Sequence, residues 1–159
     1  MKVVILSGVP GSGKSTYAKG LLAKHPSAVV CSADNYFLDK DGDYHFDPSR
    51  LSDAHAMCLR RYTSSLLYRA GDPVEVVIVD NTNTTALELA PYVALANAYK
   101  IPTYLITVEC DPDVAFKRNV HGVSLGAIQR MAQNLKDRKI PPFWKLEVEF
   151  SGEVSLTEP

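Results

Sequence analysis

The segment from residue 8 to residue 16 constrains this chain most, because it reads GVPGSGKST and matches the pattern G-x-x-x-x-G-K-[ST]. The apolar residues 3–6 before it form a short run typical of a buried strand, and residues 16–22 after it have helical apolar spacing. A glycine-rich loop in that position turns backbone N–H groups toward phosphate oxygens, and the helix N-terminus adds partial positive charge. The sequence therefore predicts a phosphate-binding loop.

The side chains of this loop have separate expected roles. Lys14 is predicted to reach the β- and γ-phosphates of ATP, and the hydroxyl of Ser15 is predicted to bind Mg²⁺. ATP and Mg²⁺ are therefore the expected cofactors. The loop residues expected at the nucleotide are Gly8, Pro10, Gly11, Ser12, Gly13, Lys14, Ser15 and Thr16.

The length of the chain favours one domain, residues 1–159, and 46% hydrophobic residues are enough to form its core. A formal net charge of −1 argues against a protein that binds nucleic acid over its whole surface, but it allows a local basic groove. Three widely spaced cysteines indicate neither a disulfide framework nor a zinc site. The beginning of the chain lacks a secretory pattern, and no apolar stretch reaches membrane-spanning length. We expect a cytoplasmic protein.

Short apolar strands alternate with helical segments along the chain, which predicts an α/β fold with a mostly parallel sheet covered on both faces. Ligands bind at the carboxyl edge of such a sheet, where the phosphate-binding loop, Asp34, Asp80 and Asp111 are expected to meet. The expected strands are residues 3–6, 28–31, 74–80, 103–108 and 146–150; the expected helices are 16–25, 51–70, 87–99, 112–118 and 124–135.

Two absences narrow the class of nucleotide-binding protein. The guanine-specific N/T-K-x-D element is missing, and Asp80 is followed by Asn81 instead of a glutamate that could activate water for hydrolysis. The first absence disfavours a guanine-nucleotide switch protein, and the second disfavours a motor-type ATPase. They favour a small kinase, in which the protein positions an acceptor hydroxyl in line with the γ-phosphoryl group.

A kinase of this type needs a general base and a residue that organises the metal. Asp34 follows the second strand and is the predicted base, although such an aspartate also serves as a helix cap or a turn residue. Asp80 follows the third strand and is predicted to orient waters on Mg²⁺, with a plain strand-end turn as the alternative.

The region of about 117–140 is basic and follows the fourth strand, where small kinases place a lid over the nucleotide. Arg118 is predicted to contact the nucleotide and stabilise the transferring phosphoryl group, and Arg130 is a second candidate. An ordinary solvated helix surface is the alternative. The basic or titratable residues of this region are Lys117, Arg118, His121, Arg130, Lys136, Arg138 and Lys139.

Aromatic residues gather after Asp34, and they serve either to stack a base or to pack the fold. Together with the basic region, they predict an acceptor channel with a basic wall and an aromatic floor, and therefore salt-sensitive acceptor binding. Residues 39–43, DKDGD, have the wrong spacing for a calcium loop and are expected to form a turn. The aromatic group contains Tyr36, Phe37, Tyr44, His45 and Phe46.

These motifs, with residues 33–36 (ADNY), 80–83 (DNTN) and 117–119 (KRN), resemble the kinase domain of phage-type polynucleotide 5′-kinases. Residues 32–48 and 118–123 are most similar to a branch containing the kinase-like domains of NEDD4-binding proteins and phage-encoded P-loop kinases. The resemblance extends to about Trp144. It implies a three-layer sandwich with strand order 2-3-1-4-5, Asp34 as base, Lys14 and Ser15 at the phosphates and metal, and Arg118 in the lid.

The resemblance also implies a nucleic acid acceptor, DNA or RNA, phosphorylated at a 5′-hydroxyl. The sequence departs from the family at Phe37 or Leu38, where polynucleotide kinases have an arginine that contacts the acceptor's phosphate, and near His121, where a second lid arginine is expected. Three alternatives therefore stay open. They are a phage DNA-modification kinase acting on a hydroxymethylated base, a small-molecule or nucleoside kinase, and a nucleotide-binding module without turnover.

Overall fold

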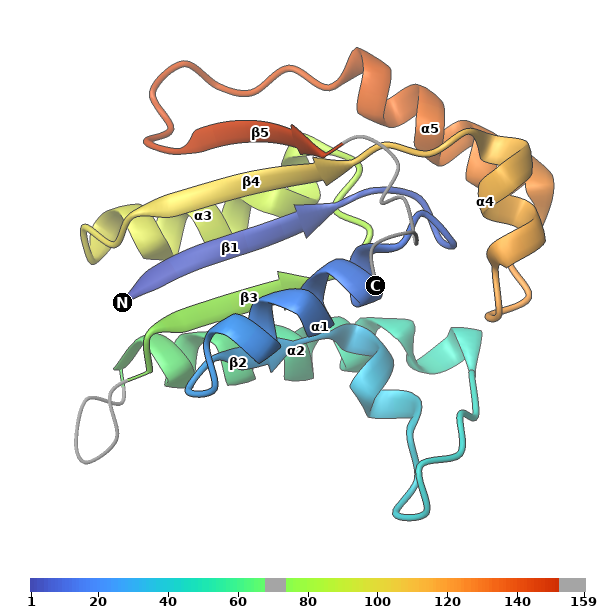
Figure 1. Ribbon diagram of the computed structural model, residues 1–159, viewed down its shortest axis with the longest axis horizontal. Coiled ribbons are helices and arrows are strands. Elements are labelled where there is room, and N and C mark those ends of the chain that lie inside the picture. Colours follow the sequence, from blue (N-terminus) through green and yellow to red (C-terminus); the bar gives the residue numbers. More distant parts are fainter. Residues whose placement is uncertain (68–73, 152–159) are drawn as a thin grey trace.

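The computed structural model describes residues 1–67 and 74–151, and for Ser151 only the backbone. Five strands and five α-helices alternate along these residues (Figure 1), with two short 3₁₀ helices, η1 and η2, between β2 and α2. In chain order the elements are β1 Lys2–Ser7, α1 Lys14–Lys24, β2 Val29–Cys31, η1 Ala33–Phe37, η2 Pro48–Arg50, α2 Leu51–Leu67, β3 Val76–Asp80, α3 Ala86–Ala98, β4 Thr103–Val108, α4 Pro112–Arg118, α5 Leu125–Asp137 and β5 Glu147–Ser151.

The five strands form one sheet in the order β2-β3-β1-β4-β5, and every neighbouring pair is parallel. This confirms the predicted order 2-3-1-4-5. Parallel strands require crossover connections, which the intervening helices provide. All five strands therefore end at the same edge of the sheet, and the loops that follow β1, β2, β3 and β4 are brought together there (Figure 1).

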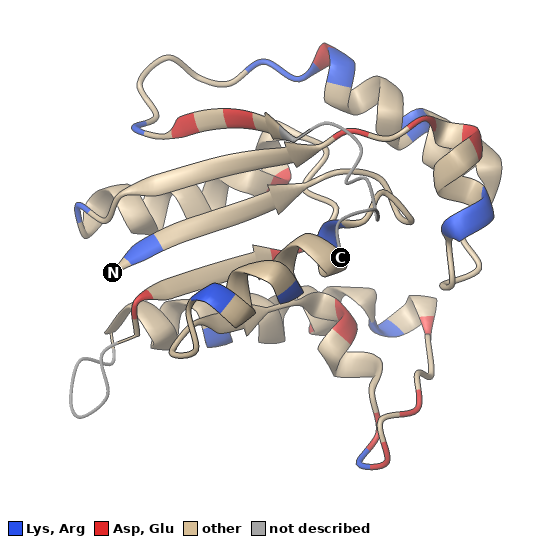
Figure 2. Cartoon of the chain, in the orientation of Figure 1, with Lys and Arg blue, Asp and Glu red and all other residues tan. Residues whose placement is uncertain are grey.

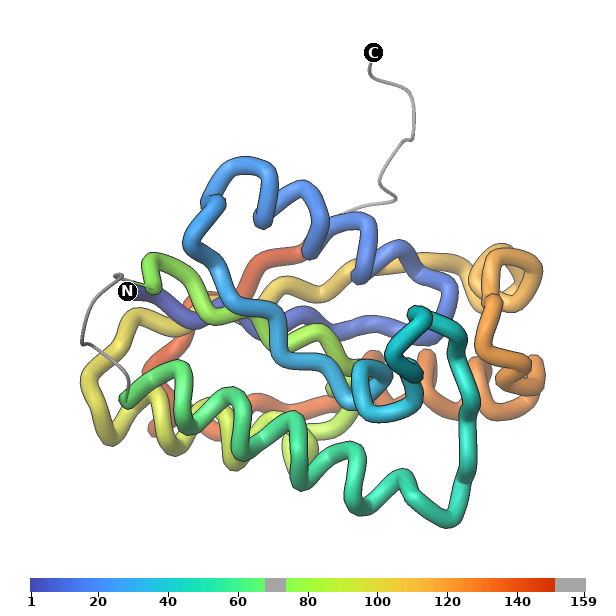
Figure 3. The backbone as a smooth tube through the Cα atoms, turned by 90° about the horizontal axis from the view of Figure 1, so that it is seen from below, coloured from blue at the N-terminus to red at the C-terminus, as the bar shows by residue number. Residues whose placement is uncertain are grey.

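Helices cover both faces of the sheet, because successive side chains of each strand point to opposite faces. In β1, Val3 and Ile5 belong to the hydrophobic cluster beneath α2 and α3. Val4 and Leu6 belong to the cluster beneath α1. Figure 3 shows the resulting three layers, with α1 on one side of the sheet and α2 and α3 on the other. The predicted three-layer architecture is confirmed.

A third and smaller cluster lies beyond the carboxyl edge of the sheet. It joins Val9 of the phosphate-binding loop to Ala115 of α4 and Ile128 of α5, all three fully buried or nearly so. The helices that follow β4 therefore pack directly against the loop. Whatever binds the loop lies next to α4.

The boundaries of the helices follow local capping chemistry. Thr85 and Glu88 form a reciprocal capping box at the start of α3, and Ser124 caps α5. Asp111 caps α4 by accepting hydrogen bonds from the N–H groups of Asp113 and Val114. Its carboxylate therefore stabilises the start of α4.

Predicted and observed boundaries differ by a few residues. The first helix begins at Lys14 instead of residue 16, because the end of the glycine-rich loop already has helical geometry. The third strand begins at Val76 instead of residue 74. The predicted helix 51–70 is observed to Leu67, and its expected last residues and Gly71 lie outside the described residues.

Within the two described ranges, we find no helix with the length and apolar character that crossing a membrane requires.

Candidate active site

The phosphate-binding loop owes its shape to glycine at a position where no other residue fits. Gly11 has φ +81°, and a Cβ on it would lie 2.1 Å from the carbonyl oxygen of Ala115 in α4. The loop backbone and α4 are therefore in direct contact. A side chain at this position would push apart the two elements that enclose the site.

The substitution Gly11→Ala is expected to lower the free energy of unfolding by at least about 1–3 kcal/mol, because it adds left-handed backbone strain to a backbone clash. Gly20→Ala is the matched control, because Gly20 lies within α1 and a Cβ added to it would meet nothing within 4 Å. That control is expected to stabilise the protein by about 0.5–1 kcal/mol. Urea denaturation of both variants measures this, and equal midpoints would contradict the packing described for Gly11.

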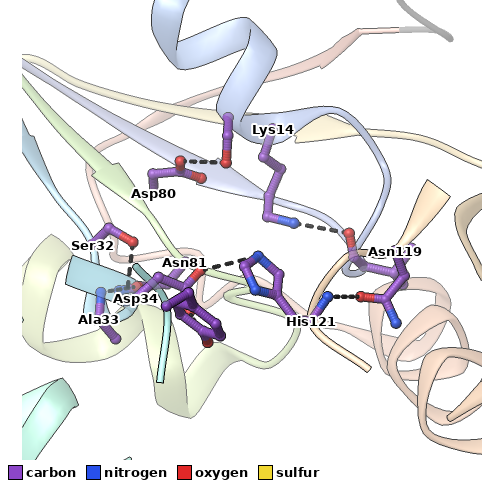
Figure 4. A network of polar contacts seen from close by, with 11 residues as sticks. Lys14, Ser32, Ala33, Asp34, Asp80, Asn81, Asn119 and His121 are labelled. Atoms are coloured by element: carbon purple, nitrogen blue, oxygen red, sulfur yellow. Dashed lines mark hydrogen bonds and ion pairs between the residues drawn. The ribbon is translucent and has the colours of Figure 1, made fainter. Parts of the chain in front are cut away.

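Lys14 is the first residue of α1, and its side chain is almost completely buried, with 8% of the residue exposed. Its Nζ donates a hydrogen bond to the carbonyl oxygen of Val9 at 2.8 Å (Figure 4). Among the described residues, the ammonium forms no ion pair. Burial lowers the pKa of Lys14 to about 8, while the charges of Asp80 and Asp34 act in the opposite direction. A buried cation that forms no ion pair with the described residues is suited to a phosphate.

The lowered pKa predicts a pH dependence of nucleotide binding. Phosphate favours the charged ammonium, so binding above a pKa of about 8 requires the uptake of a proton by Lys14. The Kd for nucleotide is therefore expected to rise by up to about tenfold for each pH unit above that value. Calorimetric titration between neutral and strongly alkaline pH measures it. The Lys14→Arg variant stays charged and is expected to lack this rise; an unchanged Kd in the unmodified protein would contradict the assignment.

Ser15 and Asp80 form the second part of the site. The hydroxyl of Ser15 donates to Asp80 Oδ2 at 2.9 Å (Figure 4), which joins the start of α1 to the end of β3. Burial raises the pKa of Asp80, while the hydrogen bond from Ser15 and the charge of Lys14 lower it.

A hydroxyl and a carboxylate at the phosphate-binding loop fit Mg²⁺, which prefers oxygen ligands and commonly takes one or two from the protein, with the rest from phosphates and water. Among the described residues, no group of three or more histidine, cysteine or acidic side chains forms a separate metal cage. Ser15 and Asp80 are therefore the residues that fit Mg²⁺ here, directly or through its waters.

Asp34 lies in the first turn of η1, after the end of β2. Ser32, and not Asp34, caps this turn: Ser32 Oγ accepts from the N–H of Asp34 at 3.3 Å. The carboxylate of Asp34 instead accepts a hydrogen bond from the hydroxyl of Tyr44 at 3.2 Å and lies 3.8 Å from His121 Nε2. The side chain is 55% exposed. A half-exposed carboxylate without a capping role is available to a ligand.

Asn81 belongs to the motif of residues 80–83, but the sequence predicted no role for it in the site. Its Oδ1 accepts from the N–H of Ala33 at 2.8 Å (Figure 4). Its Nδ2 donates to Cys58 Sγ and to the hydroxyl of Tyr92. It therefore fixes the turn that carries Asp34 to β3 and to the helices beneath it. The sequence signals at this position are the motif of residues 80–83 and the missing glutamate after Asp80, and neither of them indicates that Asn81 holds the turn of Asp34.

These residues surround a cavity of about 510 Å³ at the carboxyl edge of the sheet. Figure 4 shows Lys14, Asp34, Asp80 and His121 pointing toward the same space. The structure thus brings together the predicted base, the predicted metal residues and the phosphate-binding loop. The residues that line the cavity are Pro10, Gly11, Ser12, Gly13, Lys14, Ser15, Thr16, Ala33, Asp34, Tyr44, Phe46, Leu51, His55, Asp80, Asn81, Thr82, Glu88, Arg118, Val120, His121, Val123 and Met131.

The predicted basic wall does not form in this structure. Of the described arginines and lysines after β4, only Arg118 lines the cavity. Arg130 is exposed on α5 and is not among the lining residues. In Figure 2 the basic residues of α5 and the following loop are spread along the chain. The residue of α5 that lines the cavity is Met131, the neighbour of Arg130. Periodicity does not predict this, because the face that a helix turns toward the cavity depends on how the helix packs.

Arg138 follows the last residue of α5, and its partly buried side chain joins β1, β4 and the loop after β3. Its guanidinium donates to the hydroxyl of Ser7 at 2.6 Å, to the carbonyl oxygen of Asn83 at 2.7 Å and to the hydroxyl of Thr107 at 3.0 Å. Burial lowers its pKa. Arg138 therefore connects the end of α5 to the strand ends that support the phosphate-binding loop.

The aromatic group divides between the two predicted roles. Phe37 is 5% exposed and belongs to the hydrophobic core, whereas Tyr44 and Phe46 line the cavity. The segment between them forms the predicted turn, in which the carboxylate of Asp39 accepts from the N–H groups of Asp41 and Asp43. The cavity therefore keeps part of the expected aromatic floor.

A phosphate-binding loop and the strand order β2-β3-β1-β4-β5 around one carboxyl-edge cavity define a protein with the P-loop kinase fold. The family model described as an AAA domain, AAA_33, matches residues 3–122, and the chain belongs to this family.

Among curated proteins, NEDD4-binding protein 2 of Homo sapiens is 37% identical over 140 residues. The match covers 83% of this chain and 7% of the human protein, so the chain spans only a small part of that relative.

Three solved structures share the fold. A chain of the Pnkp1/Rnl/Hen1 RNA repair complex is 22% identical with a TM-score of 0.67, covering 85% of this chain and 44% of that one. Kti12 of Chaetomium thermophilum, in complex with ADP-AlF3, is 15% identical with a TM-score of 0.63, covering 94% and 88%. A gluconokinase from Sinorhizobium meliloti 1021 is 14% identical with a TM-score of 0.54, covering 96% and 83%. These likenesses support the fold.

Proposed function

We propose that the protein is an ATP- and Mg²⁺-dependent kinase that transfers the γ-phosphoryl group to a hydroxyl of a nucleic acid, at a 5′ end. The observation that carries this proposal is one cavity containing a buried ammonium, a hydroxyl–carboxylate pair and a separate carboxylate: Lys14, Ser15 with Asp80, and Asp34. Phosphoryl transfer needs these groups, for phosphate charge, metal and proton acceptance respectively.

In the proposed reaction, the acceptor oxygen forms a bond to the γ-phosphorus while the bond from that phosphorus to the ADP oxygen breaks. Asp34 accepts the proton of the acceptor hydroxyl, and Tyr44 holds one of its carboxylate oxygens. Lys14 and Arg118 stabilise the negative charge of the transferring group from within the cavity. Mg²⁺, when bound beside Ser15 and Asp80, supplies further positive charge to the phosphate oxygens.

The nucleic acid acceptor is supported by the sequence resemblance to polynucleotide kinases and by the structural likeness to a chain of an RNA repair complex. The gluconokinase neighbour shows that the same fold occurs in a kinase of another kind. The proposal is further supported by the position of Asp34, which lines the same cavity as the phosphate-binding loop.

The test is phosphate transfer from γ-labelled ATP to four acceptors: oligonucleotides with 5′-hydroxyl ends, the same oligonucleotides with 5′-phosphates, duplexes with a hydroxymethylated base, and free nucleosides. Label is expected on 5′-hydroxyl ends and not on 5′-phosphorylated ones. Label only on the modified base or only on nucleosides would overturn the assignment of a 5′ end. Binding of ATP with no transfer to any acceptor would favour a nucleotide-binding module.

A further inference from the structure

We propose, on the basis of the function proposed above, that the protein recognises the nucleobase of the acceptor's terminal nucleotide, by stacking on Tyr44 and Phe46, and makes little contact with the acceptor's phosphates. The acceptor class is thus a nucleoside unit at a strand end whose planar base is essential. This departs from the basic channel expected from the sequence.

The first support is the distribution of charge in the cavity. Its lysine and arginine lining residues are Lys14 and Arg118 alone, among the residues that the structure describes. Both are already engaged in the proposed reaction by the phosphates of ATP. The remaining charged lining residues are the acids Asp34, Asp80 and Glu88. Within the described part of the chain, no fixed cation of the cavity is left for an acceptor phosphate.

Arg50 is the described arginine nearest in sequence to the aromatic segment, and it is occupied elsewhere. Its guanidinium donates to the hydroxyl of Tyr36 and forms an ion pair with Asp53 at 2.8 Å. It also lies over the ring of Tyr36, 5.7 Å from the centroid, and is not a lining residue of the cavity. Arg50 therefore provides no substitute for the arginine missing near Phe37.

The second support is an apolar surface beside Asp34. The rings of Tyr44 and Phe46 are nearly parallel, with an interplanar angle of 5° and centroids 6.4 Å apart. Phe46 is 47% exposed, and Val120 on the opposite loop is 84% exposed; both line the cavity. Exposed apolar and aromatic groups beside a polar reaction centre are suited to a ligand with a flat apolar face, and a nucleobase has one.

The third support is the contact between this aromatic surface and Asp34, the proposed general base. The hydroxyl of Tyr44 donates to Asp34 Oδ1 at 3.2 Å, and the ring of His121 lies 4.7 Å from the ring of Tyr44. Burial, together with the charge of Asp34, raises the pKa of Tyr44 to about 12, so this hydroxyl stays a donor. In the proposed complex, a nucleobase stacked on this surface has its sugar beside the carboxylate of Asp34.

The experiment compares two 5′-hydroxyl oligonucleotides that differ only in their terminal residue, one with a normal base and one with an abasic tetrahydrofuran. The abasic end keeps every phosphate and the hydroxyl. Its KM is expected to be about 5- to 150-fold higher, the factor that corresponds to the loss of one stacked base. With the normal acceptor, KM is expected to change with salt no more steeply than contact with about one phosphate implies, a logarithmic slope of about 0.7.

Protein variants assign the effect to the aromatic pair. Phe46→Ala is expected to raise KM for the normal end and to reduce the difference between the normal and abasic ends, with nucleotide affinity unchanged. Tyr44→Phe keeps the ring and is expected to preserve that difference. Phe143→Ala removes another exposed phenylalanine, 78% exposed and outside the cavity, and is the control.

Equal KM values for the two ends, or a salt slope above that of about two phosphates, would overturn the inference while leaving the proposed kinase function intact. Preference for free nucleosides over oligonucleotides, with the aromatic variants still raising KM, would support base stacking and overturn the nucleic acid acceptor. The two failures are therefore distinguishable.

Discussion

Replacing Lys14 by alanine is expected to lower phosphoryl transfer by at least about 10²–10³-fold and to weaken ATP binding, because the variant loses the buried cation in the cavity. The physical reason is that Lys14 is only 8% exposed and forms no ion pair with any residue that the structure describes, so its charge acts strongly on a phosphate. Single-turnover kinetics with labelled ATP and calorimetric titration measure the two effects.

A measurement of thermal stability distinguishes this loss of phosphoryl transfer from misfolding of the variant. An ammonium buried without an ion pair costs free energy in the nucleotide-free protein, so Lys14→Ala is not expected to lower its melting temperature. Instead, the rise in melting temperature on addition of ATP is expected to disappear. Lys19→Ala, at an exposed position of the same helix, is the matched control. Full transfer by Lys14→Ala would refute the role of the loop.

The substitution Asp34→Asn is expected to lower kcat by about 10²–10⁴-fold while ATP affinity stays the same, because an amide keeps the shape of the side chain but accepts no proton. The turn is expected to survive, since Ser32 and Asn81 make the hydrogen bonds that hold it. Rapid-quench measurement of kcat and circular dichroism of the variant test both statements.

Asp41→Asn is the control for Asp34, because it removes a carboxylate from the exposed turn of the same segment. The Tyr44→Phe variant is expected to reduce kcat less than Asp34→Asn does, since it removes one hydrogen bond to the carboxylate and leaves the carboxylate in place. A kcat for Asp34→Asn within a few-fold of the unmodified protein would make Asp34 a structural residue.

Most of the fold was predictable because its signals are local. The alternation of apolar strands with helices indicated the parallel sheet, and strand order followed from the resemblance. The site residues at strand ends were also predictable. Parallel strands end at one edge of the sheet, so Asp80 and the phosphate-binding loop had to meet there.

The positions of residues on the two helices after β4 could not be predicted in this way. Arg118 and Arg130 looked similar in sequence, yet only Arg118 of these two lines the cavity. The direction of a side chain on a helix depends on how that helix packs. Here Ala115 of α4 contacts Gly11 of the loop, and Ile128 of α5 packs in the cluster that contains Ala115. That packing cannot be derived from the spacing of the basic residues.

The sequence by itself determined the phosphate-binding loop, the fold class and the candidate residues at the strand ends, because these depend on short motifs and hydrophobic periodicity. The tertiary structure alone decided which side chains surround the cavity. Arg138 contacts Ser7 across 131 positions of the chain, and Asn81 holds the turn of Asp34 across 48. Hydrogen bonds over such separations form only after strands and helices have packed, since neither partner specifies the other locally.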